Sequence, residues 1–348
     1  MRFLRVLFDK MLQSKFFYPI KPVIKAADDF FYGTPLVTQK APHILDNLDI
    51  KRYMSTVILA LLPATAAAVY FFGLRAVEII IVSYVAGGLV EVIFAVVRKK
   101  PVEEGFLVTG LIFPLVLPPT VPLWVVVVGI VFGVFFGKEV FGGTGRNIFN
   151  PALVGRLFIT IAFPQIMSTA WLLPFSDAVT AATPLVMYKS THTITPLLDL
   201  LFGNAAGSMG ETFRLGIIAG GLFLMISKVS NFRIVVAYLG TVALLSSLGN
   251  MFLPASVAPP LFQLLAGGLL FGSMFMATDP VSSCYTKGGK YVFGIGCGFF
   301  TVLIRSFSGY VEGVMFSIVF MNAFAPIIDQ IVVRIKFRPV ARGTRGRL

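Results

Sequence analysis

Apolar stretches of nearly bilayer-spanning length dominate this sequence and decide what it can fold into. A helix needs about 20 apolar residues to cross a membrane. Ten stretches approach that length, at residues 54–73, 76–97, 106–117, 121–140, 151–166, 215–228, 232–249, 261–277, 292–305 and 312–334. Hydrophobic residues make up 57% of the chain and charged residues only 13%, which is typical of integral membrane proteins. We therefore expect an all-α polytopic membrane protein with about ten transmembrane helices.

Two of these stretches are short and interrupted by Gly or Pro, and they resemble each other. GLIFPLVLPPTVP at 110–122 matches GLLFGSMFMATDP at 268–280 at five of thirteen positions. Each lies in the third stretch of a group of five, and paired broken helices of this kind mark binding sites in repeat-built membrane proteins. Because five is odd, the second group would run in the opposite sense. We predict two inverted five-helix repeats with broken or short third helices.

The distribution of Lys and Arg predicts the orientation in the membrane. With the first residues in the cytoplasm, the segments on that side carry 24 Lys and Arg, against 3 in the outer segments. This asymmetry follows the positive-inside rule and places both termini in the cytoplasm. The net charge of +13 is then explained by a face near anionic lipid, and no nucleic-acid partner is expected.

This interpretation divides the chain into five regions. Residues 1–53 form a basic cytoplasmic arm, 54–166 the first repeat, 167–214 an outer-face loop, 215–334 the second repeat and 335–348 a basic cytoplasmic tail. The two histidines are far apart in sequence, and the two cysteines lie in or beside apolar stretches. Neither pair indicates a haem, a metal centre or a disulfide framework.

Several long motifs carry a family resemblance. They are GGLVEVIFAVVRKKPVEEGFLVTG (87–110), PPTVPLW (118–124), KEVFGGTGRNIFNPALVGR (138–156), DAVTAATPL (177–185), GSMGE (207–211), FMATDPVSS (275–283) and NAFAPIIDQ (322–330). In this order they resemble the B subunit of the Na+-translocating NADH:quinone oxidoreductase and its paralogue, the D subunit of the Rnf ferredoxin:NAD+ oxidoreductase. The choice between the two stays open at this point. The resemblance implies a multi-pass protein of the bacterial inner membrane.

The resemblance gives the threonines of DAVTAATPL a chemical meaning. In the family, FMN is joined through its phosphate to a Thr in a short motif, which TAAT at 180–183 matches with Thr183 as the acceptor. Thr180 and Ala182 would flank the flavin and keep the site open. By the predicted orientation this site lies on the outer face.

The Gly-rich stretch KEVFGGTGRN lacks the pattern of a nucleotide-binding phosphate loop. The family resemblance implies noncovalent riboflavin and a quinone site near the cytoplasmic surface. We therefore predict that this stretch contacts riboflavin or lies beside the quinone. Helix packing and capping are an equally weighted alternative. The candidate residues are Gly142, Gly143, Gly145, Arg146, Asn147 and Asn150.

Gly87 and Gly88 interrupt a helical pattern, where each costs up to about 1 kcal/mol relative to Ala. Close helix packing in the bilayer is the ordinary explanation, and the resemblance adds a role beside the quinone.

Acidic side chains in or beside the apolar stretches are the candidates for a cation pathway, because a charge at membrane depth is costly. They are Glu91, Glu211, Asp279 and Asp329. Helix capping is the alternative for Asp279, which precedes Pro280. Oxygen ligands suit hard cations, but these residues do not distinguish Na+ from H+.

We therefore predict one component of a cation-translocating oxidoreductase, incomplete as an enzyme on its own. The sequence contains no NAD(P)H-binding fold and no iron–sulfur ligand set. The resemblance implies partner subunits, including a second subunit with covalent flavin and an iron–sulfur/flavin subunit. A secondary transporter without redox chemistry, or a scaffold, would also suit an inverted repeat.

Overall fold

The computed structural model describes residues 50–99, 105–175 and 181–337, and of Ile50 and Lys51 the backbone only. This part of the chain forms helices and no strand element. Six helices are long and apolar enough to span a membrane, and three shorter apolar helices accompany them. The predicted all-α polytopic membrane fold is confirmed. The predicted arm and tail lie largely outside the described residues, as does Thr180.

The ten predicted stretches correspond to nine helices and one broken segment of the described chain. The first five are α3 (Ile50–Phe72), α4 (Leu74–Arg98), α5 (Gly105–Leu115), α6 (Leu123–Gly137) and α7 (Pro151–Ala162). The second five are α11 (Arg214–Ile226), α12 (Phe232–Phe252), a broken segment, α15 (Lys287–Phe307) and α16 (Val314–Phe337). The broken segment comprises α13 (Pro260–Leu265), α14 (Leu269–Phe271) and η3 (Gly272–Met276), a π-helical turn.

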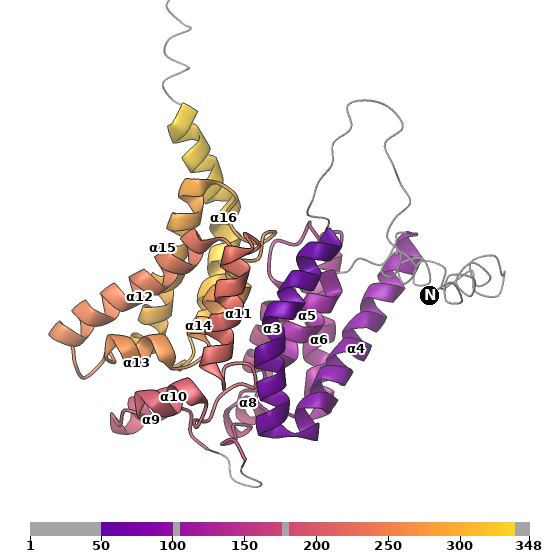
Figure 1. The fold of residues 1–348 in the computed structure, drawn as a ribbon. Helices are drawn as coiled ribbons and strands as arrows, with labels where there is room; N and C mark the ends of the chain where they lie inside the picture. The colour runs from indigo at the N-terminus through magenta and orange to yellow at the C-terminus, as the bar shows by residue number, and fades with distance from the viewer. Residues whose placement is uncertain (1–49, 100–104, 176–180, 338–348) are drawn as a thin grey trace, which may run out of the picture.

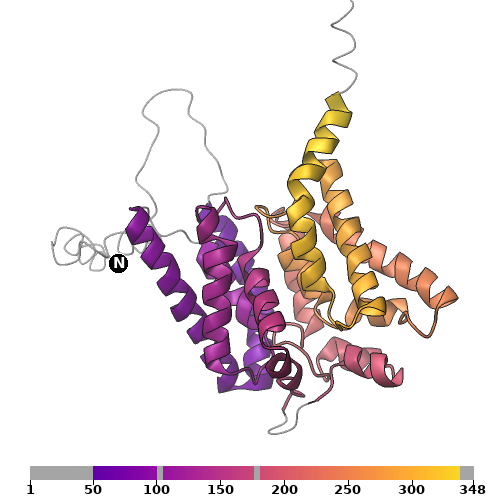
Figure 2. The same ribbon diagram turned by 180° about the vertical axis from the view of Figure 1, so that it is seen from behind.

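The two groups of helices pack in the same pattern. In the first half α6 contacts α4 and α7, and in the second half α15 contacts the equivalent α12 and α16. The first helices of the halves, α3 and α11, run antiparallel, because Tyr53 near the start of α3 donates a hydrogen bond of 2.6 Å to the carbonyl of Val229, just after α11. The halves stand side by side (Figures 1 and 2). This arrangement is the predicted inverted repeat.

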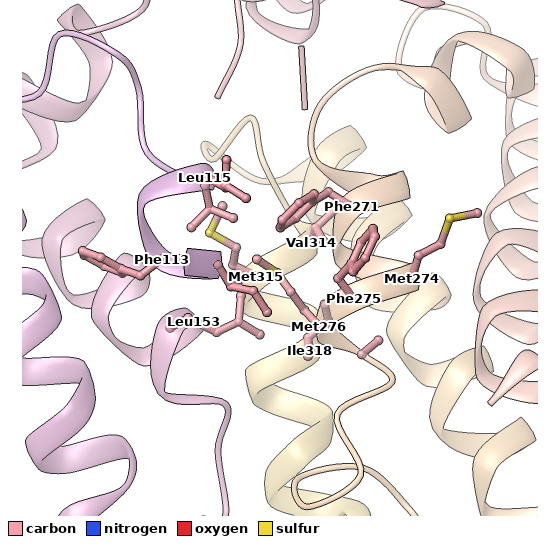
Figure 3. Close-up of a cluster of buried hydrophobic side chains, with 14 of the residues drawn as sticks. Phe113, Leu115, Leu153, Phe271, Met274, Phe275, Met276, Val314, Met315 and Ile318 are labelled. Atoms are coloured by element: carbon pink, nitrogen blue, oxygen red, sulfur yellow. The ribbon is translucent and has the colours of Figure 1, made fainter. Parts of the chain in front are cut away.

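A shared apolar core joins the halves at their broken third segments. Leu115 and Leu153 of the first half lie toward Phe271, Phe275 and Met276 of the second, whereas the Phe113 ring points back into the first half (Figure 3). These side chains are buried. Both repeats therefore place their interrupted helices at the interface between them.

The interruption frees backbone carbonyls, and each is satisfied from elsewhere in the chain. Gly210 donates its N–H to the carbonyl of Leu115 at 2.6 Å, and Met209 donates to Leu117 at 3.1 Å. At the end of α13, the Arg305 guanidinium donates to the carbonyls of Gln263 at 2.8 Å and Ala266 at 3.1 Å. Unpaired backbone groups are not tolerated in a bilayer interior. These long-range bonds make the broken helices possible.

The region between the halves is more structured than the polar loop expected at 167–214. It contains α8 (Pro164–Thr169), α9 (Pro184–Thr191) and α10 (Leu197–Phe202), the last two of which lie at the end of the bundle opposite the end of α16 (Figure 1). Pro196 precedes α10 and Gly203 ends it with φ 92°, so local residues define these short helices. Thr183, around which the flavin site is predicted, therefore lies in a folded region.

We expect Gly220→Ala to destabilise the protein, because a Cβ at Gly220 would collide with the carbonyl oxygen of Ala60 on α3. Overpacking of this kind costs about 1–3 kcal/mol. The matched control is Gly240→Ala on α12, where a Cβ meets no atom within 4 Å. Thermal unfolding in detergent should show a lower Tm for the first variant only, and equal Tm values would contradict the close α3–α11 crossing.

We also expect Arg305→Met to lower the unfolding temperature, because it leaves the carbonyls of Gln263 and Ala266 without their donor. An unsatisfied buried carbonyl costs about 1–3 kcal/mol. Arg334→Met, at an exposed position on α16, is the control. A variant at 305 that unfolds like the wild type would show that the end of α13 does not depend on this guanidinium.

Candidate functional site

Two polar hollows lie at opposite ends of the bundle, where the halves meet. The termini-side cavity lies where α3 begins, and it is lined by Tyr53, Thr109, Lys138, Thr144, Asn147, Asn150, Thr278 and Asp279 among others. The loop-side pocket lies beside α9 and is lined by Arg156, Trp171, Thr183, Glu211, Tyr310, Glu312 and Phe316 among others. The sequence-predicted site residues divide between these two places.

The Gly-rich stretch forms a tight turn at the termini-side cavity. Gly142, Gly143 and Gly145 have φ of 117°, 101° and 85°, a backbone region that favours Gly. Asn150 caps α7 by accepting a hydrogen bond from Ala152 N at 3.1 Å, and Asn147 donates to the carbonyl of Phe149 at 3.0 Å. Both asparagines line the cavity, whereas Arg146 is exposed. The structure thus gives these residues turn and capping roles and brings two of them to a cavity.

Glu91 forms a buried ion pair that the sequence did not reveal. Its partner is Lys138, 47 residues away, and the side chains are 4% and 3% exposed. Next to it Arg98 pairs with Glu139 at 2.8 Å. Lys138 thus lines the termini-side cavity and pairs with Glu91, which is not among the lining residues. A charge pair buried at this depth is a candidate gate for a cation.

Asp279 and Asp329 hold different loops. Asp279 lines the termini-side cavity and accepts hydrogen bonds from Val281 N at 3.2 Å and Ser282 Oγ at 2.8 Å. Asp329 is buried on α16 and accepts from Tyr285 N at 2.8 Å and Thr286 N at 3.0 Å. Helix capping, the alternative expected for Asp279, is not observed, because the residues after it form a turn and the next helix begins only at Lys287; Asp279 stabilises that turn, and Asp329 anchors the loop before α15.

Gly87 and Gly88 allow α4 to pack against its neighbours. A Cβ at Gly87 would lie 2.8 Å from the Ile130 side chain on α6, and one at Gly88 would lie 3.2 Å from Phe106 on α5. Helix packing accounts for both positions in this chain. The predicted role beside a quinone stays a prediction.

Thr183 stands at the start of α9, at the rim of the loop-side pocket. It is the N-cap residue, and its hydroxyl accepts a hydrogen bond of 3.4 Å from Val186 N. Its side chain is half-buried, and Ala182 beside it is exposed. Pro184 follows as the first helical residue, which fixes the helix start. The hydroxyl is therefore held at a helix N-terminus beside a pocket.

The loop-side pocket contains a buried guanidinium with an unused donor. Arg156 is 4% exposed, and its Nη1 donates to Thr160 at 3.0 Å while its Nε has no partner. The guanidinium also lies 5.7 Å from the centre of the Trp171 ring. An unpaired buried donor is costly, so this atom is suited to an acceptor that enters the pocket.

Two carboxylates face each other in the same pocket. A Cβ at Gly268 would lie 3.2 Å from one Glu211 oxygen and 3.8 Å from one Glu312 oxygen. Ser208 N donates to Glu211 at 2.8 Å, and Arg305 pairs with Glu312 at 3.2 Å. Burial, reinforced by the charge of Glu312, raises the pKa of Glu211 to about 7. Burial and the neighbouring Glu312 therefore both favour the protonated form of Glu211.

Sequence reasoning missed Arg156, Arg214, Arg305, Glu312 and Lys138. These residues sit at the ends of apolar stretches, where charges normally face water. The only sequence feature that could have identified them is the position of an Arg, Lys or Glu within one helical turn of an otherwise uncharged stretch. The described residues contain no group of three or more His, Cys, Asp or Glu able to hold a metal ion.

Replacing Lys138 by Met is expected to destabilise the protein, because it removes the cation that the structure places on the buried Glu91. Breaking one side of a buried pair costs about 3–5 kcal/mol. The double variant Glu91→Gln/Lys138→Met should recover most of that loss. Thermal unfolding of the three proteins measures the coupling, and additive losses would contradict a direct pair.

Comparison with known proteins agrees with this architecture. The model of the NQR2, RnfD, RnfE family matches residues 37–338. The chain is 37% identical to the B subunit of the Na(+)-translocating NADH-quinone reductase of Ectopseudomonas mendocina, over 89% of this chain and 91% of the relative. The B subunits of the same reductase from Klebsiella pneumoniae subsp. pneumoniae and Azotobacter vinelandii are 35% and 36% identical, over 93% and 89% of this chain and 94% and 91% of theirs. This chain belongs to the NQR2, RnfD, RnfE family.

Proposed function

We propose that this chain is the B-type membrane subunit of a Na+-translocating NADH:quinone oxidoreductase, and that it carries FMN on Thr183. The relatives' names support the first part, and they favour the B subunit of that enzyme over the Rnf paralogue. The observation that carries the second part is the Thr183 hydroxyl at the rim of a pocket that holds an unpartnered Arg156 N–H. Activity belongs to the assembled complex, to which this chain contributes its membrane part.

The loop-side pocket fits the parts of FMN. Its volume of about 340 Å³ lies within the usual range for ligand sites. The phosphate on Thr183 would lie at the N-terminus of α9, where backbone N–H groups favour an anion. Trp171, Tyr310 and Phe316 provide aromatic surface for a ring system. When bound, the flavin supplies one- and two-electron redox chemistry.

The chain itself would anchor the flavin, orient it and balance its charge. Thr183 fixes the phosphate end, and Arg156 offsets its negative charge. Glu211 and Glu312 oppose that anion. Arg305, which pairs with Glu312, and the positive charge of Arg214, which acts on Glu211, offset the two carboxylates. A proton taken up by Glu211 would reduce the repulsion further, which links the protonation of this carboxyl to the charge in the pocket.

The termini-side cavity supports a cation pathway better than a flavin site. Its volume is about 70 Å³, which holds a few water molecules but is below the range of small-molecule sites. Riboflavin does not fit a cavity of this volume. The Asp279 carboxylate and the unpartnered Thr144 hydroxyl offer oxygen ligands for Na+ or H+ at this end. The names of the relatives favour Na+.

The proposal includes the rest of the complex as partners. These are membrane and peripheral subunits, among them a second subunit with covalent flavin and an iron–sulfur/flavin subunit. The family resemblance supports a bacterial inner-membrane location, and the positive-inside count supports cytoplasmic termini and an outward-facing Thr183. In the structure the end of α16 and the helices around Thr183 do lie at opposite ends of the bundle (Figure 2).

The flavin anchor predicts a mass difference that one substitution abolishes. Intact mass of the denatured wild-type chain, purified from a host able to attach flavin, should exceed the sequence mass by one FMN less one water. Thr183→Asn should lack this addition, because Asn keeps an N-cap acceptor but has no hydroxyl to esterify. The control Thr191→Val, at the other end of α9, should keep it.

An unmodified wild-type chain would overturn the flavin anchor. The inverted repeat without redox chemistry would then favour the secondary transporter. An addition that persists in Thr183→Asn would move the anchor to another residue.

A further inference from the structure

Hydroxyl side chains from both halves converge on the termini-side cavity. Thr109 on α5 and Thr144 in the turn before α7 come from the first half. Ser230 before α12 and Thr278 after η3 come from the second half. The carboxylate of Asp279 lines the same cavity. Segments that are distant in sequence therefore bring side-chain oxygens to one small space.

Two of these four hydroxyl groups have no hydrogen-bond partner. Ser230 is 6% exposed, and its Oγ is buried without a donor or acceptor among the described residues. The Oγ1 of Thr144 is likewise buried and unpartnered in the described chain, although Ser and Thr hydroxyls commonly bond to a nearby backbone group. Burying an unbonded hydroxyl is costly. Both oxygens therefore indicate a ligand that occupies this cavity.

The other two hydroxyl groups have already donated their protons. Thr109 Oγ1 donates to the carbonyl of Gly105 at 3.3 Å, and Thr278 Oγ1 donates to the carbonyl of Met274 at 2.7 Å. A hydroxyl oxygen that donates its proton keeps lone pairs for a further partner. These lone pairs are suited to a positively charged ligand.

The charges that line the cavity also favour a cation. Lys138 is the one basic residue among the lining residues, and it pairs with Glu91. Asp279 makes no ion pair within the described part of the chain, and its oxygens accept from Val281 N and Ser282 Oγ. A carboxylate without a counter-charge is costly away from water. One monovalent cation would neutralise it.

Gly105 gives the Thr144 side chain its place at the cavity. A Cβ at position 105 would lie 2.7 Å from Cγ2 and 2.9 Å from Oγ1 of Thr144, too close for any side chain to be added without a shift. The Thr144 hydroxyl is therefore positioned by close packing against a glycine and not by a hydrogen bond. An oxygen held in this way is available to coordinate an ion.

We propose that Ser230 and Thr144 make this cavity specific for Na+, by coordinating the ion together with Asp279. The inference rests on the proposed cation pathway and adds the ligands that distinguish Na+ from H+. A carboxylate alone is sufficient to hold a proton, whereas a hard metal cation takes several oxygen ligands. Water molecules alone would satisfy the two hydroxyl groups but would leave Asp279 without a counter-charge.

Direct binding of radioactive Na+ to the intact complex in detergent tests this assignment. Ser230→Ala should weaken binding at this site about 10-fold, because it removes one oxygen ligand from a charged partner. Ser230→Ala/Thr144→Val should bind one Na+ fewer than the wild type at a concentration that saturates the wild type. The control is Ser227→Ala, which lies at the end of α11 outside the cavity and whose hydroxyl bonds to the carbonyl of Phe223.

Ion selectivity separates coordination from a structural role. Quinone reduction by the complex is titrated with Na+ and with Li+, and the ratio of the two half-saturating concentrations should change in Ser230→Ala and in Thr144→Val. Thr144→Ser, which keeps the hydroxyl, should retain the wild-type ratio. An equal rise in both concentrations would indicate a structural role and would overturn the assignment.

The outcomes also distinguish this site from the proposed function. Wild-type binding and selectivity in Ser230→Ala and Thr144→Val would overturn the site and leave the cation-translocating function standing. A wild-type complex that binds no Na+ would overturn the proposed function, and this inference with it.

Discussion

The need to satisfy every backbone polar group inside a membrane governs this structure. The third segment is a short helix in the first half and a broken one in the second, and where such a segment ends inside the bundle it leaves carbonyls that need donors. The chain supplies donors from distant segments: N–H groups of Met209 and Gly210 for the end of α5, and the Arg305 guanidinium for the end of α13. Arg214 likewise donates to the carbonyls of Leu200 and Leu265. These bonds tie the region between the halves to both broken segments.

The same breaks explain where the polar hollows lie. Broken helices leave room for side chains that a continuous helix would exclude, and both hollows open beside them at the meeting of the halves. The charges in them are paired: Glu91 with Lys138 at one end, and Glu312 with Arg305 at the other. A buried pair is costly to form and more costly to break. This makes the paired charges suited to respond when a cation or an anionic group enters.

The two ends have different chemistry, which suits a protein that couples electron transfer to cation movement. The loop-side pocket combines a presented hydroxyl, an unpartnered guanidinium N–H and aromatic rings. The termini-side cavity is small and contains oxygen ligands beside an ion pair.

The sequence by itself determined the membrane class, the ten apolar segments and their breaks. It also singled out the two paired glycine-containing stretches, because hydrophobic length, Gly and Pro act locally, whereas Thr183 was predicted from the family resemblance. The predicted inverted repeat is confirmed in the antiparallel α3 and α11. The polar region 167–214 was predicted without its helices α8, α9 and α10, since short helices held by tertiary contacts leave little periodicity.

Only the tertiary structure decided which polar groups meet. Lys138 reaches Glu91 across 47 residues, and Arg305 reaches the carbonyl of Gln263 across 42. No residue within one helical turn of Lys138 or Arg305 indicates its partner, because the pairing depends on how helices from distant parts of the chain pack. The hydrophobic periodicity and composition of a segment indicate only the structure that this segment prefers. A site depends on side chains that several segments bring together.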